Sequence, residues 1–543
     1  MNKESPILRP DTSVSRENFL RAKSVGACQG KTYVLKYTPV MKILLRGFFM
    51  FKIGFSNDKY VKLQSQNIRD RISKFGGKLY LEFGGKLFDD YHASRVLPGF
   101  EPDSKVRMLL EMKDEAEIVI AISADDIERS KRRGDLGITY DEDTLRLIDA
   151  FRGIGLYFGS VVITHYRGQP IADKFIKRLE ALGIRVYKHY IIPEYPSNVS
   201  LIVSEEGFGK NDYIETSRSL VVVTAPGPGS GKMATCLSQL YHEHLRGVSA
   251  GYAKFETFPI WNLPLKHPVN LAYEAATADL DDVNMIDPFH LDAYGVTTVN
   301  YNRDVEIFPV LEAMFKRMYG ESPYQSPTDM GVNMAGYAII DDDACREASK
   351  QEILRRWYTA ACAERQGLGS VDEVRRIKLI MDSLDISSAD RPVVAAALNK
   401  AEETGGPAVA LELPDGAIVT GKTSSLLGAS SACLLNALKY LAGIDRKLPL
   451  IAPGVIAPIQ HLKVEHLGNH NPRLHTDELL IALSICAVTN PMAGCAIDQL
   501  NSLRGCEAHS SVILSKVDED LFKKLGVNIS FEPKYQAKKL FHK

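Results

Sequence analysis

The residues best suited to chemistry form a glycine-rich loop between an apolar run and an amphipathic segment. The β-branched run 220–224 predicts a buried strand, and Lys232 opens a segment with the apolar period of a helix. A strand, a glycine loop and a helix together point backbone N–H groups and a positive helix end at an anion. We therefore predict that the loop binds the phosphate of a nucleotide or another phosphorylated ligand. The predicted phosphate-binding residues are Gly227, Gly229, Ser230, Gly231 and Lys232.

The loop resembles a P-loop but departs from the pattern G-x-x-x-x-G-K-[ST] at two positions. Pro226 replaces the first glycine, and Met233 replaces the Ser or Thr that binds Mg²⁺. The resemblance is closest to the deviant P-loops of dethiobiotin synthetase and the cobyrinate amidating enzymes. In those proteins a Gly-Tyr-type strand with a lysine follows the helix, as Gly251-Tyr-Ala-Lys254 does here. The alternative interpretation is a tight glycine turn that binds no ligand.

A phosphate bound by Lys232 calls for Mg²⁺, and hard cations prefer carboxylate oxygens. The segment 279–292 is rich in acidic residues and also contains a histidine. We predict that Asp282 or Asp287 binds Mg²⁺ in place of the missing hydroxyl. The alternative is a solvated acidic surface loop.

A second polar group follows the strand predicted at 78–83. Acid, base and cation at a strand end suit substrate capture or proton transfer, and Gly84-Gly85 would let the backbone approach a ligand closely. The alternative is a polar turn in which an Asp caps the next helix. The group consists of Glu82, Lys86, Asp89, Asp90, His92 and Arg95, and the predicted catalytic residues are Asp90, His92 and Lys86.

Two groups near the C-terminus complete the candidates. His461, His466, His470 and His475 lie within fifteen residues and favour a zinc or iron site, as in a metal-dependent hydrolase. Their spacing is not H-E-x-x-H, and the residues after His475 could simply cap a helix. The segment Gly421-Lys-Thr-Ser-Ser425 could bind an anion at a helix start or form only a strand, a turn and a cap.

Composition limits the classes of protein to consider. With 543 residues the chain needs two to four domains. A formal net charge of −1 argues against nucleic-acid binding, and no apolar run reaches the roughly 20 residues of a membrane helix. The eight cysteines form no C-x-x-C pair, which is typical of reduced thiols in a cytoplasmic protein. Several Tyr and Phe residues at exposed positions are consistent with a homo-oligomer.

Strands alternate with helices from about residue 50, which predicts an α/β protein with a mainly parallel sheet. We expect residues 1–49 to be an N-terminal extension, disordered or a mis-assigned start with Met50 as the first residue. We place an α/β domain with the glycine loop at 50–304, a mainly helical section at 305–391 and a C-terminal α/β domain at 392–543.

Three longer segments resemble the bacterial domain-of-unknown-function 1846 family. They are 80–100 (YLEFGGKLFDDYHASRVLPGF), 225–235 (APGPGSGKMAT) and 284–290 (NMIDPFH). The resemblance runs from about Phe51 to the C-terminus. It implies a multidomain α/β protein whose C-terminal domain has roughly cytidine-deaminase-like topology. It implies no reaction, and the deaminase signature H-x-E…P-C-x-x-C is absent.

These patterns favour a soluble enzyme that binds ATP or another phosphorylated ligand at 226–232, with Mg²⁺, and activates or phosphorylates a small metabolite. Two alternatives remain open. One is a metal-dependent hydrolase that uses the histidines between His461 and His475, and the other is a protein that binds a ligand without turning it over.

Overall fold

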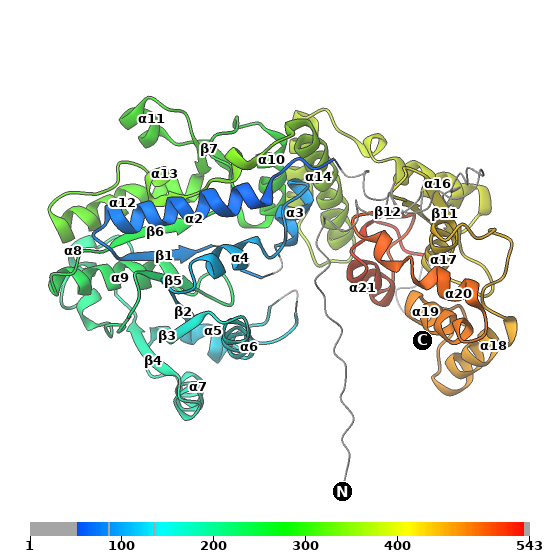
Figure 1. The fold of residues 1–543 in the computed structure, drawn as a ribbon, viewed down its shortest axis with the longest axis horizontal. Helices are drawn as coiled ribbons and strands as arrows, with labels where there is room; N and C mark the ends of the chain where they lie inside the picture. The colour runs from blue at the N-terminus through cyan, green and yellow to red at the C-terminus, as the bar shows by residue number, and fades with distance from the viewer. Residues whose placement is uncertain (1–51, 85–86, 89, 134–135, 537–543) are drawn as a thin grey trace, which may run out of the picture.

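The computed structural model describes residues 52–84, 87–88, 90–133 and 136–536. Figure 1 shows two lobes joined by long helices: a large α/β lobe built around one parallel sheet, and a smaller C-terminal lobe with its own sheet. The mixed α/β class expected from the sequence is confirmed. The expected N-terminal extension lies outside the described residues.

The large lobe is organised by a seven-stranded sheet in which every strand pair is parallel. Its strand order is β4-β3-β2-β5-β1-β6-β9. The strands are β1 (Leu79–Phe83), β2 (Ala116–Ser123), β3 (Tyr157–Tyr166), β4 (Arg185–Tyr190), β5 (Leu220–Thr224), β6 (Gly251–Phe255) and β9 (Gly331–Val332). β1, β2 and β5 are buried along their whole length, as expected of strands covered on both faces.

Successive residues of a strand belong to two separate hydrophobic cores because their side chains alternate between the faces of the sheet. On one face Leu79 and Leu81 of β1 join a large core, and on the other Tyr80 joins a second core. The first face is covered by α2 (Asn57–Lys74), α3 (Tyr91–Val96), α4 (Ser104–Glu111), α5 (Ala124–Glu128), α6 (Tyr140–Gly153), α7 (Pro170–Ala181) and α10 (Pro268–Ala276). The second is covered by α8 (Val199–Ile202), α9 (Lys232–Leu245) and α12 (Asn302–Tyr319).

The remaining elements of the large lobe lie between α10 and the joining helices. They are β7 (Asn284–Ile286), α11 (Pro288–Tyr294), β8 (Val299–Tyr301) and α13 (Pro327–Met330), together with 3-10 turns at Phe208–Lys210, Ala278–Leu280 and Ala335–Ala338. β7 and β8 form a small antiparallel sheet. The first part of the section 305–391, where we expected mainly helices, belongs to the large lobe. There α12 packs on the large sheet and β9 pairs with β6 at its edge.

The long helix α14 (Asp342–Arg365) leads toward the C-terminal lobe, together with α15 (Val371–Ser383) and α16 (Pro392–Thr404). The C-terminal sheet has the order β11-β10-β12-β13, antiparallel except for the β12–β13 pair. Its elements are β10 (Ala408–Glu412), β11 (Ile418–Lys422), β12 (Glu507–Ser510), β13 (Asn528–Phe531), α17 (Ala429–Leu441), α18 (Pro453–His461), α19 (Thr476–Ala487), α20 (Pro491–Ile497) and α21 (Lys516–Lys524). A π-helical turn spans Leu462–His466, and 3-10 turns span Ser388–Asp390 and Leu500–Leu503.

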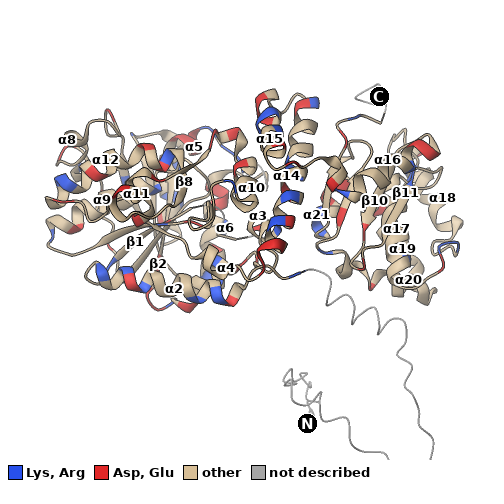
Figure 2. Ribbon diagram, turned by 90° about the horizontal axis from the view of Figure 1, so that it is seen from above, with Lys and Arg blue, Asp and Glu red and all other residues tan. Residues whose placement is uncertain are grey.

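An ion-pair network along α14 ties the two lobes together. Glu352 of α14 bonds to Arg95 of α3 at 3.0 Å and to Arg355 at 2.8 Å. Arg355 also reaches Glu507 of β12 at 2.7 Å, and fully buried Arg391 contacts the same carboxylate at 2.5 Å. Burial opposes the charge of Glu352, but the surrounding guanidinium groups outweigh it and hold the pKa of Glu352 well below its usual value. Figure 2 shows blue and red residues together on α14, between the lobes.

Among the residues that the structure describes, no helix is both long enough and apolar enough to cross a membrane.

Replacing Arg391 tests the buried part of this network. Arg391 also donates to the carbonyls of Ala508 and Asn528 at 2.9 and 3.0 Å. Arg391→Met keeps the aliphatic volume but takes the guanidinium away from these two carbonyls and leaves Glu507 with Arg355 as its one remaining arginine partner, so we expect a loss of about 3 kcal/mol in unfolding free energy. Urea denaturation measures it. The matched control is Arg375→Met, at an ion pair with 75% exposed side chains, where we expect less than about 0.5 kcal/mol. Equal losses in both variants would contradict a structural role for the buried network.

Candidate phosphate-binding crevice

The order of the strands creates a crevice between the carboxyl ends of β5 and β1. The chain leaves β1 toward β2 through α3 and α4, on one face of the sheet. It leaves β5 in the opposite direction, toward β6, through α9 on the other face. Connections that diverge in this way open a crevice at the strand ends, where parallel α/β sheets bind their ligands. The glycine loop 225–231 and Gly84 both border it.

The glycine loop is held in one shape by its own hydrogen bonds and by β3. Gly229 and Gly231 have φ angles of 75° and 79°, in the left-handed region where glycine carries no steric penalty. Fully buried Ser230 donates its hydroxyl to the carbonyl of Gly227 at 2.9 Å. Thr164, at the end of β3, donates to the carbonyl of Ser230 at 2.8 Å. Two loop carbonyls are thus bonded inside the protein, and α9 begins directly after Gly231.

Lys232 is the first residue of α9, and its charge there is uncompensated. It forms no hydrogen bond or ion pair with any residue that the structure describes, and it is only partly exposed. A cation at the N-terminus of a helix opposes the positive end of the helix dipole. An unpaired lysine is therefore unfavourable at this position unless an anion binds beside it.

Tyr140, at the start of α6, packs against the outer side of the loop. A Cβ atom at Gly227 would collide with the Tyr140 hydroxyl, which is why only glycine fits there. The Lys131 ammonium lies 5.0 Å from the centre of the Tyr140 ring. Lys131 belongs to the basic turn 129–133 and also pairs with Asp126 at 3.3 Å.

A partly buried acid–base cluster occupies the carboxyl ends of β1 and β6, on the face of the sheet covered by α9 and α12. Lys254 of β6 lies 2.7 Å from Glu256 and 2.5 Å from Asp304 of α12. Glu82, beside Lys254 in the sheet register, accepts a hydrogen bond of 2.7 Å from Tyr252. Three carboxylates and one ammonium therefore lie at the carboxyl ends of β1 and β6.

Burial sets the protonation of this cluster. Loss of hydration raises the pKa of Glu256 to about 8, although Lys254 opposes the shift. Burial also disfavours the charge on Lys254, but Asp304 and Glu256 outweigh it and raise the pKa of Lys254 above its usual value. A carboxyl group that titrates near neutral pH beside a permanent cation is suited to accept or donate a proton during a reaction.

The structure assigns two of the predicted catalytic residues to structural contacts. Asp90 caps α3 by accepting from the N–H of Ala93, and it pairs with Lys105 at 2.8 Å. His92 lies 3.4 Å from Glu352, and burial lowers the pKa of His92. Its Nε2 atom is buried with no hydrogen-bond partner among the described residues. Lys86, the third predicted residue, lies outside the described residues, as does Asp89.

The two predicted Mg²⁺ ligands are engaged by other parts of the protein. Both carboxylate oxygens of fully buried Asp287 accept hydrogen bonds, one from the N–H of His290 and the other from the N–H and hydroxyl of Thr328. Asp282 pairs with Arg303 at 2.6 Å. Asp287 is thus a helix cap and Asp282 an ion-pair partner, and neither fits a Mg²⁺ site as arranged here.

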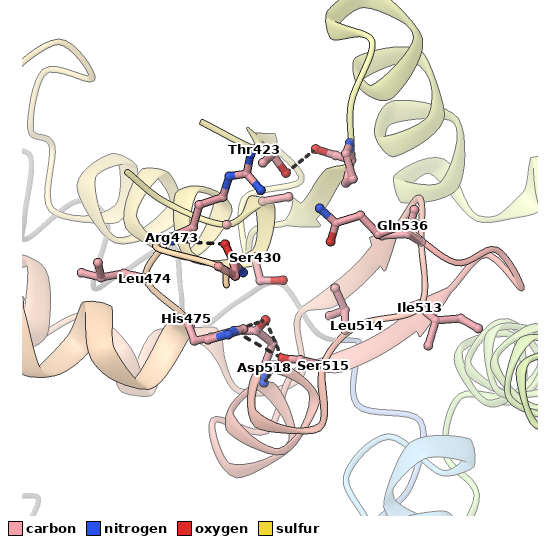
Figure 3. A pocket seen from close by; sticks show the side chains of 15 residues that line it. Thr423, Ser430, Arg473, Leu474, His475, Ile513, Leu514, Ser515, Asp518 and Gln536 are labelled. Carbon is pink, nitrogen blue, oxygen red and sulfur yellow. Dashed lines mark hydrogen bonds and ion pairs between the residues drawn. The ribbon is translucent and has the colours of Figure 1, made fainter. Parts of the chain in front are cut away.

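The four C-terminal histidines do not converge either. His461 and His466 stack edge to face at 5.4 Å, whereas His475 caps α19 and bonds to Asp518 at 3.2 Å. Within the described ranges, no three His, Cys, Asp or Glu side chains are placed to hold a metal ion. The structure instead brings His475 together with Thr423 of the 421–425 segment, around one cavity of the C-terminal lobe (Figure 3).

Sequence reasoning missed several residues of the crevice. Glu256 could have been predicted from its position, because it lies two residues after the lysine of the Gly-Tyr-Ala-Lys strand. Asp304 was hidden in a longer acidic run. Thr164 and Tyr140 carried no signal, because each acts on the loop across more than sixty residues of chain.

Comparison with known proteins identifies relatives along nearly the whole chain. Family models described as the N-terminal and C-terminal parts of the domain of unknown function DUF1846 match residues 53–385 and 389–541. A "UPF0371 protein" of Streptococcus thermophilus strain LMD-9 is 60% identical over 494 residues, which cover 91% of this chain and 100% of that protein. One from Streptococcus pneumoniae strain JJA is 59% identical with the same coverage. The resemblance seen in the three motif segments is confirmed.

The raised pKa of Glu256 predicts how stability depends on pH. Between about 4.3, its unfolded value, and its raised folded value, the folded chain binds more protons than the unfolded chain, so this group makes stability fall as pH rises. Glu256→Gln cannot ionise. Its unfolding free energy relative to wild type should increase by at least about 1.4 kcal/mol from about pH 5 to about pH 8, the equivalent of one pKa unit.

Urea denaturation at the two pH values gives this difference. Glu321→Gln, at an exposed position of the same lobe, is the matched control and should change equally little at both. A Glu256→Gln curve parallel to that of wild type would show that Glu256 is not held protonated.

Proposed function

We propose that this chain, which belongs to the DUF1846 family, binds a phosphorylated small molecule in the crevice between β5 and β1 and acts on it there. The ligand is ATP or another phosphate compound. The loop Gly227–Gly231 would surround a phosphate with backbone N–H groups, and Lys232 would neutralise its charge.

The unpaired cation at the start of α9 carries this proposal. The N–H groups of the first helical turn and the ammonium of Lys232 are all positive, and no described carboxylate pairs with that ammonium. An unpaired, partly exposed cation beside a helix N-terminus is unfavourable in the free protein and becomes favourable when a phosphate binds. The divergence of the chain at β5 and β1 supports the same position for the ligand.

The acid–base cluster supports chemistry on a bound ligand. Lys254 is the lysine that follows the deviant P-loop in sequence, and Glu82 lies beside it on the strand next to β5. Lys254 would contact negative charge that develops during the reaction, and Glu256 would move a proton to or from the substrate. The class of reaction most compatible with these groups is phosphoryl transfer to, or activation of, a small metabolite.

Mg²⁺ stays part of the proposal, but we assign no side chain to it. Asp282 and Asp287 are both committed to protein donors, and no other described carboxylates form a ligand group. We therefore assign the neutralisation of phosphate to Lys232 and the helix dipole.

Two finer expectations remain proposals. The hairpin β10–β11, followed by the parallel pair β12–β13 with helices between, supports a deaminase-like topology without the deaminase metal ligands. All seven cysteines in the described part of the chain are free and six are buried, which supports a reducing, cytoplasmic location.

Thermal denaturation of Lys232→Ala tests the proposed function. Without ligand, the variant should be as stable as wild type or slightly more so, because the substitution removes a cation that opposes the helix dipole. With ATP or a phosphate compound at about a hundredfold its Kd, wild type should gain about 2.7 kcal/mol and the variant should gain almost nothing.

Lys174→Ala, at an exposed site of α7, is the matched control and should keep the full ligand-induced gain. An equal gain in Lys232→Ala and wild type would rule out the glycine loop as the site. A ligand that binds wild type without being converted, across nucleotides and candidate acceptors, would identify a binding protein rather than an enzyme.

A further inference from the structure

The C-terminal lobe contains a small, partly open cavity where three helices begin. Its volume is about 70 Å³, and it is lined by residues from the starts of α17, α19 and α21 and from the segments before them. Figure 3 shows Ser430, Arg473 and His475 around it. A cavity of this size suits one small polyatomic group.

Ser430 supplies a hydrogen-bonding group that the protein itself does not use. The residue is only 2% exposed, yet its hydroxyl has no hydrogen-bond partner in the described part of the chain. In Figure 3 this side chain points into the cavity. Ser430 is the second residue of α17, whose N-cap is Gly428 and therefore has no side chain to satisfy the first backbone N–H groups.

Arg473 adds a positive charge at the rim of the cavity. Its Nε atom donates to the carbonyl of Ser424 at 2.8 Å, and this hydrogen bond holds the guanidinium in place. No carboxylate pairs with it among residues 52–536 that the structure describes. The planar fork of an arginine is well matched to two oxygens of a phosphate or carboxylate.

His475 also lines the cavity, and its partner Asp518 is already engaged by several protein donors. The oxygens of Asp518 accept from the N–H and hydroxyl of Thr476, both at 2.9 Å, from Ser515 at 2.9 Å and from His475. The hydrogen bond to Asp518 raises the pKa of His475. Ser515, His475 and Asp518 do not form a hydrolytic triad, because Ser515 and Asp518 both approach the same nitrogen of the His475 ring, Nδ1.

We propose that this cavity binds one phosphate group, in contact with the Ser430 hydroxyl, the first N–H groups of α17, Arg473 and His475. This site is separate from the crevice of the large lobe and does not depend on its function. The phosphate is either inorganic phosphate or the terminal group of a small phosphorylated metabolite.

Calorimetric titration of full-length Lys232→Ala with inorganic phosphate tests the proposal, because that variant removes the site proposed in the large lobe. We expect one phosphate to bind per chain. Arg473→Gln and Ser430→Ala, each added to Lys232→Ala, should weaken binding at least tenfold. Arg504→Gln, an exposed arginine of the same lobe outside the cavity, should leave it unchanged.

Far-ultraviolet circular dichroism verifies that each variant is folded. Arg473 is partly exposed, so Arg473→Gln does not disturb a packed core even if Ser430→Ala does. Phosphate binding that is absent, or equal in all three double variants, overturns the proposal. A repeat titration with methyl phosphate separates the two sources: tighter binding than that of inorganic phosphate indicates a phosphorylated metabolite.

Discussion

The large lobe depends on one constraint: all seven strands of its sheet run in the same direction, so their carboxyl ends meet at one edge. The connections then diverge to opposite faces after β1 and β5, which places the glycine loop and the end of β1 side by side (Figure 1). Residues far apart in sequence thereby reach the same edge of the sheet. The cluster around Lys254 follows from this arrangement, because β6 is the other neighbour of β1.

The way in which charged groups are paired distinguishes the structural ion pairs from the groups at the proposed site. An ionised group in a protein interior is retained only if a partner offsets its lost hydration. The network around Glu352 and Glu507 meets this condition within the protein and serves to join the lobes. Lys232, which is partly exposed, has no such partner among the described residues, and Glu256 holds a proton because burial raises its pKa. These two groups differ from the structural ion pairs, and both lie beside the crevice.

Local patterns allowed the parallel sheet and the glycine loop to be predicted, since strand period, turn glycines and helix starts depend on neighbouring residues. The roles of isolated acids and histidines could not be predicted in this way. Asp287 is committed to Thr328, forty-one residues away, and His475 to Asp518, forty-three residues away. A carboxylate that caps a distant segment and one that binds Mg²⁺ look alike in sequence, because only the folded chain determines which donors reach them.

The most direct measurement is a crystal of the protein soaked in tungstate, a heavy analogue of phosphate that anomalous scattering locates without ambiguity. The account predicts a tungstate ion against the N–H groups of Gly229 to Lys232, within reach of the Lys232 ammonium, and its loss in crystals of Lys232→Ala. Tungstate bound elsewhere with the glycine loop unoccupied, or an ion at the loop that persists in Lys232→Ala, would contradict the claim that this crevice binds phosphate through that lysine.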